Sequence, residues 1–151
     1  MTGIRDFGAL VGRIMLALIF FLSGCQKLMG PAGTMKMMAA HGVPVVPAAF
    51  AVTILAEFGC SLLLILGYKA RWAALLLFIW FIPVTLLFHV AAYHQAVLEQ
   101  KPMDALIQQI MFMKNISIMG GLLMVASFGP GAISLDGRTE TEPLAGNLRA
   151  A

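Results

Sequence analysis

The chain has 151 residues, of which 60% are hydrophobic and 11% are charged, and its mean hydropathy is +0.91. Soluble domains carry about 25% charged residues, so this chain lacks the polar residues that would cover a globule in water. Its 10 basic and 7 acidic residues give a net charge of +3, and the basic residues are scattered along the chain. The composition argues against a soluble enzyme, a secreted disulfide scaffold, a disordered chain and a DNA-binding module, and it indicates a single domain in a lipid bilayer.

Four apolar windows are long enough to cross a membrane, because a bilayer core of about 30 Å needs about 20 helical residues. Each window is apolar on all sides, as expected for a helix surrounded by lipid. The windows are Gly8–Leu28, Pro47–Gly67, Trp72–Ala92 and Ile107–Ser127. The sequence therefore predicts an all-α membrane protein in which residues 1–151 form one domain, an antiparallel bundle of four transmembrane helices.

The connections between the windows carry turn and loop residues. The segment Gly67–Arg71 is so short that it predicts a tight turn between antiparallel neighbours. Within the first loop, Met29–Val46, Thr34 caps a short Met-rich helix that runs to Ala40, or the segment is a plain loop. The segment Tyr93–Leu106 is predicted to be a polar loop.

The fourth helix has signals at both ends. Pro102 suits the first turn of a helix, and Gly129-Pro130-Gly131 stops it. The residues that follow, 132–151, are predicted to form a polar, solvated tail.

The distribution of basic residues predicts the orientation. With four crossings, both termini and the turn Gly67–Arg71 lie on the same side of the membrane. That side holds six lysines and arginines, whereas the opposite side holds three. Because basic residues favour the cytoplasmic side, both termini are predicted to be cytoplasmic. The six are Arg5, Arg13, Lys69, Arg71, Arg138 and Arg149, and the three are Lys27, Lys36 and Lys101.

The two cysteines offer little chemistry. Cys25 and Cys60 show no metal-ligand spacing, and their depths in the predicted helices differ by roughly 15 Å, too far for a disulfide. Leu22-Ser23-Gly24-Cys25 also resembles a bacterial lipoprotein signal with Cys25 as the lipidated residue. That alternative would remove the first helix and leave three spans.

Each predicted helix carries a titratable group in the same half of the membrane. These are Lys27, Glu57, His89 and Lys114, the last followed by Asn115. Charges near the bilayer centre cost about 2.5–3.5 kcal/mol each, so they usually face one another or a wet cavity. We therefore predict an ion pair between Glu57 and Lys114, which either has a function or only fixes helix register. Lys27 alone is expected to extend toward the headgroups.

The chain also resembles a known family, the DoxX family of small four-span bacterial membrane proteins. The resemblance covers about residues 10–136. Its motifs are Ser23-Gly24-x-x-Lys27-Leu28, Gly42-x-Pro44, Glu57 followed by small residues, Leu66-Gly67, Arg71 with Ala73-Ala74, His89, Lys114-Asn115, Gly120-Gly121-Leu122-Leu123, and Gly129-Pro130-Gly131 leading to Ser134-Leu135-Asp136.

The resemblance implies a four-helix bundle in the bacterial inner membrane. The family takes its name from a subunit linked to thiosulfate:quinone oxidoreduction, and relatives are tied to quinone stress and to membrane oxidoreductase complexes. The implied role is therefore a quinone-interacting subunit or partner of a membrane oxidoreductase, a possible enzyme subunit whose electrons come from another protein. The quinone is not covalently bound, and no metal, haem or nucleotide signature is present.

In this hypothesis Glu57 and Lys114 are the catalytic candidates. The quinone-binding candidates are Lys27, Glu57, His89, Lys114 and Asn115, because a quinone needs hydrogen-bond donors and a proton carrier. Two rival functions stay open. In the first, the protein is a non-enzymatic membrane anchor or assembly partner. In the second, it transports a small solute or protons, for which it would form a homo-oligomer.

Overall fold

The structure, a computed structural model, describes residues 2–137, and within this range the regular elements are all helical. Two of them, named η1 and η2, are π-helical segments inside longer helices. The elements are α1 (Thr2–Met29), α2 (Pro31–Ala40), α3 (Val46–Ile54), η1 (Leu55–Gly59), α4 (Cys60–Leu66), α5 (Ala70–Val84), η2 (Thr85–Val90), α6 (Ala91–Leu98) and α7 (Pro102–Phe128).

Four continuous helical stretches are long and apolar enough to cross a membrane, which confirms the predicted fold class. They are Gly3–Met29, Val46–Leu66, Ala70–Leu98 and Pro102–Phe128. The predicted loop Tyr93–Leu106 is wrong, because α6 continues to Leu98 and α7 begins at Pro102. Only residues 99–101 turn the chain, with Gln100 at a positive φ of 54° and the Lys101 N–H donating to the Ala96 carbonyl.

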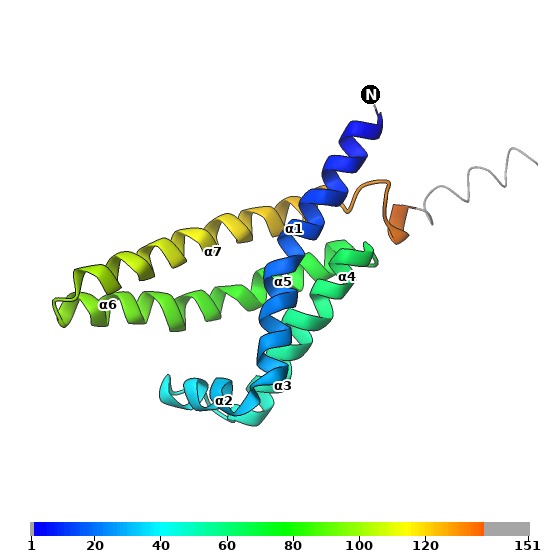
Figure 1. The fold of residues 1–151 in the computed structure, drawn as a ribbon. Coiled ribbons are helices and arrows are strands. Elements are labelled where there is room, and N and C mark those ends of the chain that lie inside the picture. Colours follow the sequence, from blue (N-terminus) through cyan, green and yellow to red (C-terminus); the bar gives the residue numbers. More distant parts are fainter. Residues whose placement is uncertain (1, 138–151) are drawn as a thin grey trace, which may run out of the picture.

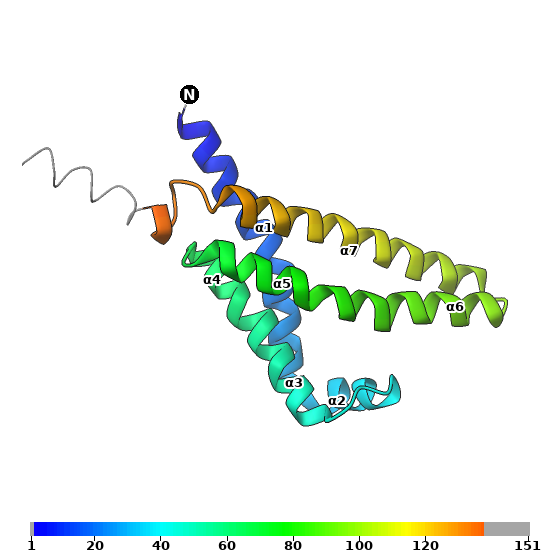
Figure 2. The same ribbon diagram turned by 180° about the vertical axis from the view of Figure 1, so that it is seen from behind.

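The helices form two antiparallel hairpins (Figure 1). The first hairpin pairs α1 with α3, η1 and α4, and the second pairs α5, η2 and α6 with α7. Both views show the hairpins crossing near the start of α5 and diverging away from it (Figures 1 and 2). The bundle is therefore closed at the end that holds the α4–α5 turn and splayed at the other.

The core lies where the hairpins meet. Phe20 of α1 packs edge-to-face on Phe81 of α5, with ring centroids 5.0 Å apart. Small residues line this contact and allow close packing of the helices. The buried cluster consists of Ala17, Phe20, Cys60, Leu64, Ala70, Ala73, Ala74, Leu77 and Leu122. Both cysteines are free thiols, as predicted.

The first loop contains a helix, α2, so the helical alternative is correct. It begins at Pro31 rather than after Thr34, because proline suits the first helical position. The end of α2 reaches the second hairpin, where the His41 ring lies 4.7 Å from the Phe88 ring of η2.

The segment after α7 connects the two hairpins at the closed end of the molecule. Buried Arg13 donates to the carbonyls of Pro130, Ile133 and Ile65. The Asp136 carboxylate accepts from the N–H groups of Lys69 and Ala70, at 2.8 and 3.0 Å, and so caps α5.

The first residues of the predicted tail are not solvated as predicted. Ser134 is buried, and the backbone N–H of Asp136 donates to the Gly67 carbonyl. These contacts tie residues 132–137 to the hairpins. The rest of the predicted tail, residues 138–151, lies outside the described residues.

Gly67 is required for these contacts at the closed end. Its φ of 67° is left-handed and ends α4, and an added Cβ would lie 2.4 Å from the Ser134 Cβ and 3.0 Å from the Arg13 guanidinium carbon. The Leu66-Gly67 and Ser134-Leu135-Asp136 motifs thus meet in space.

Candidate functional site: a buried lysine–glutamate pair

A partly buried ion pair joins the two helices of the first hairpin. The Lys27 Nζ lies 2.6 Å from the Glu57 Oε2 and also donates to the Ser23 hydroxyl, one turn earlier on α1. The Lys27 side chain is 22% exposed and that of Glu57 is 7% exposed. Both residues lie within membrane-spanning helices, so each charge is stabilised chiefly by the other.

Gly24 allows this pair to form. An added Cβ at Gly24 would lie 2.9 Å from the Phe58 Cβ and 3.2 Å from the Phe58 backbone. Next to it, the rings of Phe21 and Phe58 stack at 5.3 Å. The two helices therefore touch closely where the charges meet, and the Ser23-Gly24-x-x-Lys27 motif supplies the partner hydroxyl, the close contact and the cation.

Glu57 lies in a π-helical segment, and so does His89. Such segments are rare and occur frequently at functional sites. For η2 the sequence contains a cause, because Pro83 lacks the N–H that would bond to the Ile79 carbonyl. We find no comparable cause for η1.

The predicted ion pair between Glu57 and Lys114 is wrong. Lys114 is exposed, and its ammonium donates a hydrogen bond to the Met111 sulfur, at 3.4 Å. Glu57 and Lys114 lie on different hairpins, since η1 packs against α1 whereas α7 packs chiefly against α5, η2 and α6. On α7 it is Asn115, not Lys114, that takes the inward position. The expectation that Lys27 extends to the headgroups is also wrong, because Lys27 turns to Glu57.

The other polar candidates lie on the second hairpin. His89 Nδ1 is 2.9 Å from the Gln108 Oε1, and the Asn115 amide donates to the Thr85 hydroxyl at 3.0 Å. Sequence reasoning missed Gln108 and Thr85, although both are polar residues within or beside apolar windows. No hydrogen bond joins these groups to Lys27 or Glu57 among residues 2–137.

Asn115 stands out because its Oδ1 is buried without a hydrogen-bond donor. A buried acceptor in this state costs about 1–3 kcal/mol unless a water or ligand satisfies it. Asn115 therefore stays a binding candidate, as do His89 and Lys114, but the structure does not bring the three together with Glu57.

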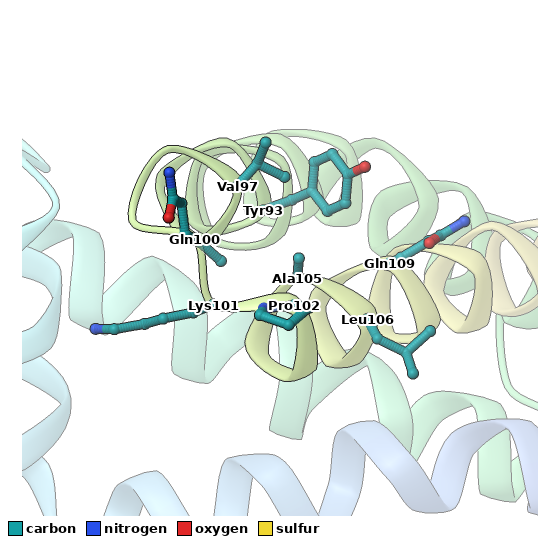
Figure 3. A pocket seen from close by; sticks show the side chains of 9 residues that line it. Tyr93, Val97, Gln100, Lys101, Pro102, Ala105, Leu106 and Gln109 are labelled. Carbon is teal, nitrogen blue, oxygen red and sulfur yellow. The ribbon is translucent and has the colours of Figure 1, made fainter.

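The clearest pockets lie at the two ends of the second hairpin. One, of about 620 Å³, lies at the α6–α7 tip, where Tyr93 and Val97 of α6 and Ala105 and Gln109 of α7 line it, while the Lys101 side chain points away from the helices (Figure 3). A second, of about 690 Å³, lies at the closed end beside Arg71 and Gly129. Neither is lined by the ion pair. Among residues 2–137, no group of three or more His, Cys, Asp or Glu side chains is arranged to hold a metal.

Comparison with known proteins places this arrangement in a family. A sequence profile of the DoxX family matches residues 8–90, which include Lys27, Glu57 and His89. The chain belongs to the DoxX family. As predicted, this DoxX protein is a multi-pass protein of the bacterial inner membrane, because its relatives include proteins named for that membrane and its helices are long enough to cross it.

Two of these relatives are from Escherichia coli (strain K12). The chain is 36% identical to Inner membrane protein YqjF, over 90% of this chain and 95% of that protein. It is 37% identical to Inner membrane protein YphA, over 88% of this chain and 95% of that protein. The Surfeit locus protein 4 homolog of Drosophila melanogaster is 30% identical over 87% of this chain but only 41% of its own length. No solved structure matches the chain.

Proposed function

We propose that this DoxX protein binds a quinone headgroup at the Lys27–Glu57 pair and serves as the partner of a membrane oxidoreductase. The observation that carries the proposal is a buried ion pair with unused hydrogen-bonding capacity. An ammonium has three N–H donors, and Lys27 uses two of them, on Ser23 and on Glu57 Oε2. No residue in the described range donates to Glu57 Oε1.

These two free positions suit the two states of a quinone. The third Lys27 N–H donates to a carbonyl oxygen of the oxidised form, and Glu57 Oε1 accepts from a hydroxyl of the reduced form. The charge on the Glu57 carboxylate makes Oε1 a strong hydrogen-bond acceptor. The half-buried rings of Phe21 and Phe58 provide an adjacent apolar surface. A quinone supplies two-electron redox chemistry when bound, and the proposal assigns the electrons to the partner oxidoreductase.

The test is quinone binding to the purified full chain in detergent, with decylubiquinone as the probe. Losing a hydrogen bond to a charged group costs about 1.5–3 kcal/mol, so Lys27→Gln and Glu57→Gln are each expected to raise the Kd about 10- to 100-fold. Lys36→Gln is the matched control, because the same change is made on an exposed lysine of α2, outside the candidate binding residues. Unchanged binding in both pair variants would contradict the proposal.

A second candidate function, assembly with another membrane protein, is favoured by α7. Lys114, Ser117 and Gly120 lie on an exposed face of this helix within the membrane-spanning stretch. A lysine and two small residues on such a face suit a neighbouring helix that carries a carboxylate. Photo-crosslinking in native membranes tests this role. A crosslinker at Ser117 is expected to capture a protein that Lys114→Leu releases, and capture unaffected by Lys114→Leu counts against it.

A further inference from the structure

The pocket at the closed end of the molecule has the features of a phospholipid site. It has a volume of about 690 Å³ and is formed by the start of α5, the end of α7 and the segment that follows α7. Lys69 immediately precedes the third membrane-spanning stretch, and Phe128 ends the fourth. The pocket therefore lies at the height of the lipid headgroups.

Two cations line this pocket with unused donors. The Arg71 guanidinium donates one hydrogen bond, from Nη1 to the Ser127 carbonyl at 2.8 Å. Its Nε and Nη2 make no hydrogen bond within residues 2–137, and neither does the Lys69 ammonium, which lies 5.9 Å from the centre of the Tyr68 ring. Both side chains are exposed. A guanidinium with two free N–H edges beside an ammonium suits a phosphate group.

The backbone beneath Arg71 is shaped for this position. Gly129 has φ 86° and ψ −179°, a conformation that is essentially confined to glycine. An added Cβ there would lie 3.1 Å from Arg71 Nη2 and 3.2 Å from Nε. Glycine thus lets the guanidinium lie flat against the chain, and the bond to Ser127 fixes its orientation.

The other residues that line the pocket suit the acyl chain of a lipid, and the one carboxylate among them is already hydrogen-bonded. Trp72 and Phe128 line the same pocket and are 67% and 75% exposed, so they offer an apolar path toward the bilayer. Tryptophan is typical of this depth in a membrane. The Asp136 carboxylate also lines the pocket, but it accepts hydrogen bonds from the first N–H groups of α5.

We propose that this pocket binds an anionic phospholipid, with its phosphate on Lys69 and Arg71 and an acyl chain along Trp72 and Phe128. The site is independent of the Lys27–Glu57 pair and of the function proposed for it. Its ligand is identified by its chemistry, a phosphodiester with a net negative charge that is attached to a hydrocarbon chain.

The experiment is native mass spectrometry of the full chain, released from detergent with phosphatidylglycerol or phosphatidylcholine added. Phosphatidylglycerol adducts are expected to outnumber phosphatidylcholine adducts. One interfacial lysine is worth about 1 kcal/mol toward an anionic lipid, so Lys69→Gln is expected to weaken phosphatidylglycerol binding about fivefold. This variant keeps the backbone N–H that donates to Asp136. Lys36→Gln is the matched control, since Lys36 is exposed on α2.

Other results would overturn the proposal. Equal loss in Lys69→Gln and Lys36→Gln would mean that only the total charge matters. Equal retention of phosphatidylglycerol and phosphatidylcholine would show that Lys69 and Arg71 do not select a negatively charged lipid. Competition by inorganic phosphate that abolishes the adducts at equimolar concentration would make the pocket a site for free phosphate. Arg71→Lys keeps the charge but not the planar donors, and it is expected to weaken binding as well.

Discussion

Three of the cations in the membrane-spanning helices, Arg13, Lys27 and Lys114, have different surroundings. Arg13 is buried and donates to carbonyl oxygens at the closed end. Lys27 pairs with Glu57. Lys114 is exposed beside Met111. Of the three, Lys27 is the one whose neutralisation would leave a carboxylate buried without its counter-charge, so its contribution to stability is the easiest to measure.

We expect Lys27→Met to destabilise the protein strongly. Removing one partner of a buried pair leaves the other charge uncompensated, which costs about 3 kcal/mol. Lys114→Met removes an exposed charge from the membrane-spanning region and is expected to be neutral or stabilising. The measurement is the free energy of unfolding by SDS titration in mixed micelles, followed by circular dichroism.

A double variant separates the burial of the charge from packing. In Lys27→Met with Glu57→Leu no charge is left unpaired, so most of the lost stability should return. A double variant as unstable as Lys27→Met alone would show that the side chains matter for shape, not for charge.

At the scale of the helix, the hairpins depend on where glycine allows contact. Gly24 touches the backbone of η1, and Gly121 faces the Leu16 side chain at 3.2 Å from an added Cβ. Gly120, next to Gly121, has open space around it. Two adjacent glycines thus have different roles, one in packing and one on the exposed face of α7.

Gly24→Ala is expected to separate α1 from η1. The added methyl group overlaps Phe58 and so costs about 1–3 kcal/mol, and it should also weaken the Lys27–Glu57 pair. Gly120→Ala is the matched control, because the methyl group meets nothing and alanine favours the helix by about 0.5–1 kcal/mol. SDS unfolding measures both variants. Equal effects at the two positions would contradict the assigned packing.

The sequence was sufficient for the four spans but not for the length of the third helix or the pairing of the charges. Apolar length alone located the four spans, and Pro102 marked the start of α7. The partner of Glu57 depended on which helix η1 packs against, which is α1 and which hydropathy does not reveal. On α7, Lys114 and Asn115 are adjacent, so a rotation of one residue decides which of them faces inward. The apolar windows have no polar face that would fix this rotation. The sequence signal for the contact of Lys27 with Glu57 was Gly24, one turn before Lys27.

At the scale of the molecule, the two hairpins are held together mainly at one end. Arg13 and Asp136 connect the first and second hairpins there through the segment after α7, and the hairpins diverge beyond it (Figure 2). These contacts join residues more than 60 positions apart, which neither helical periodicity nor hydropathy reveals. The polar pairs of the two hairpins, Lys27 with Glu57 and Asn115 with Thr85, belong to separate arms as a result.

The orientation of the whole molecule in the membrane is a further prediction. At the closed end, Arg5, Lys69 and Arg71 lie outside the hydrocarbon core of the bilayer or at its edge. The opposite ends of the hairpins hold Lys36 and Lys101. Lys101 is paired with Glu99 at 2.7 Å. Because basic residues resist translocation, the closed end is expected to face the cytoplasm.

Reporter fusions test this orientation in cells. Green fluorescent protein fused after Ala151 is expected to fluoresce, since it folds in the cytoplasm, and alkaline phosphatase at the same position is expected to be inactive. Alkaline phosphatase inserted after Gln100, in the α6–α7 turn, should be active because that turn faces the opposite side. The reverse pattern would place Lys69, Arg71 and the proposed phospholipid pocket in the outer leaflet. Activity at both positions would contradict a single membrane crossing by α7 between them.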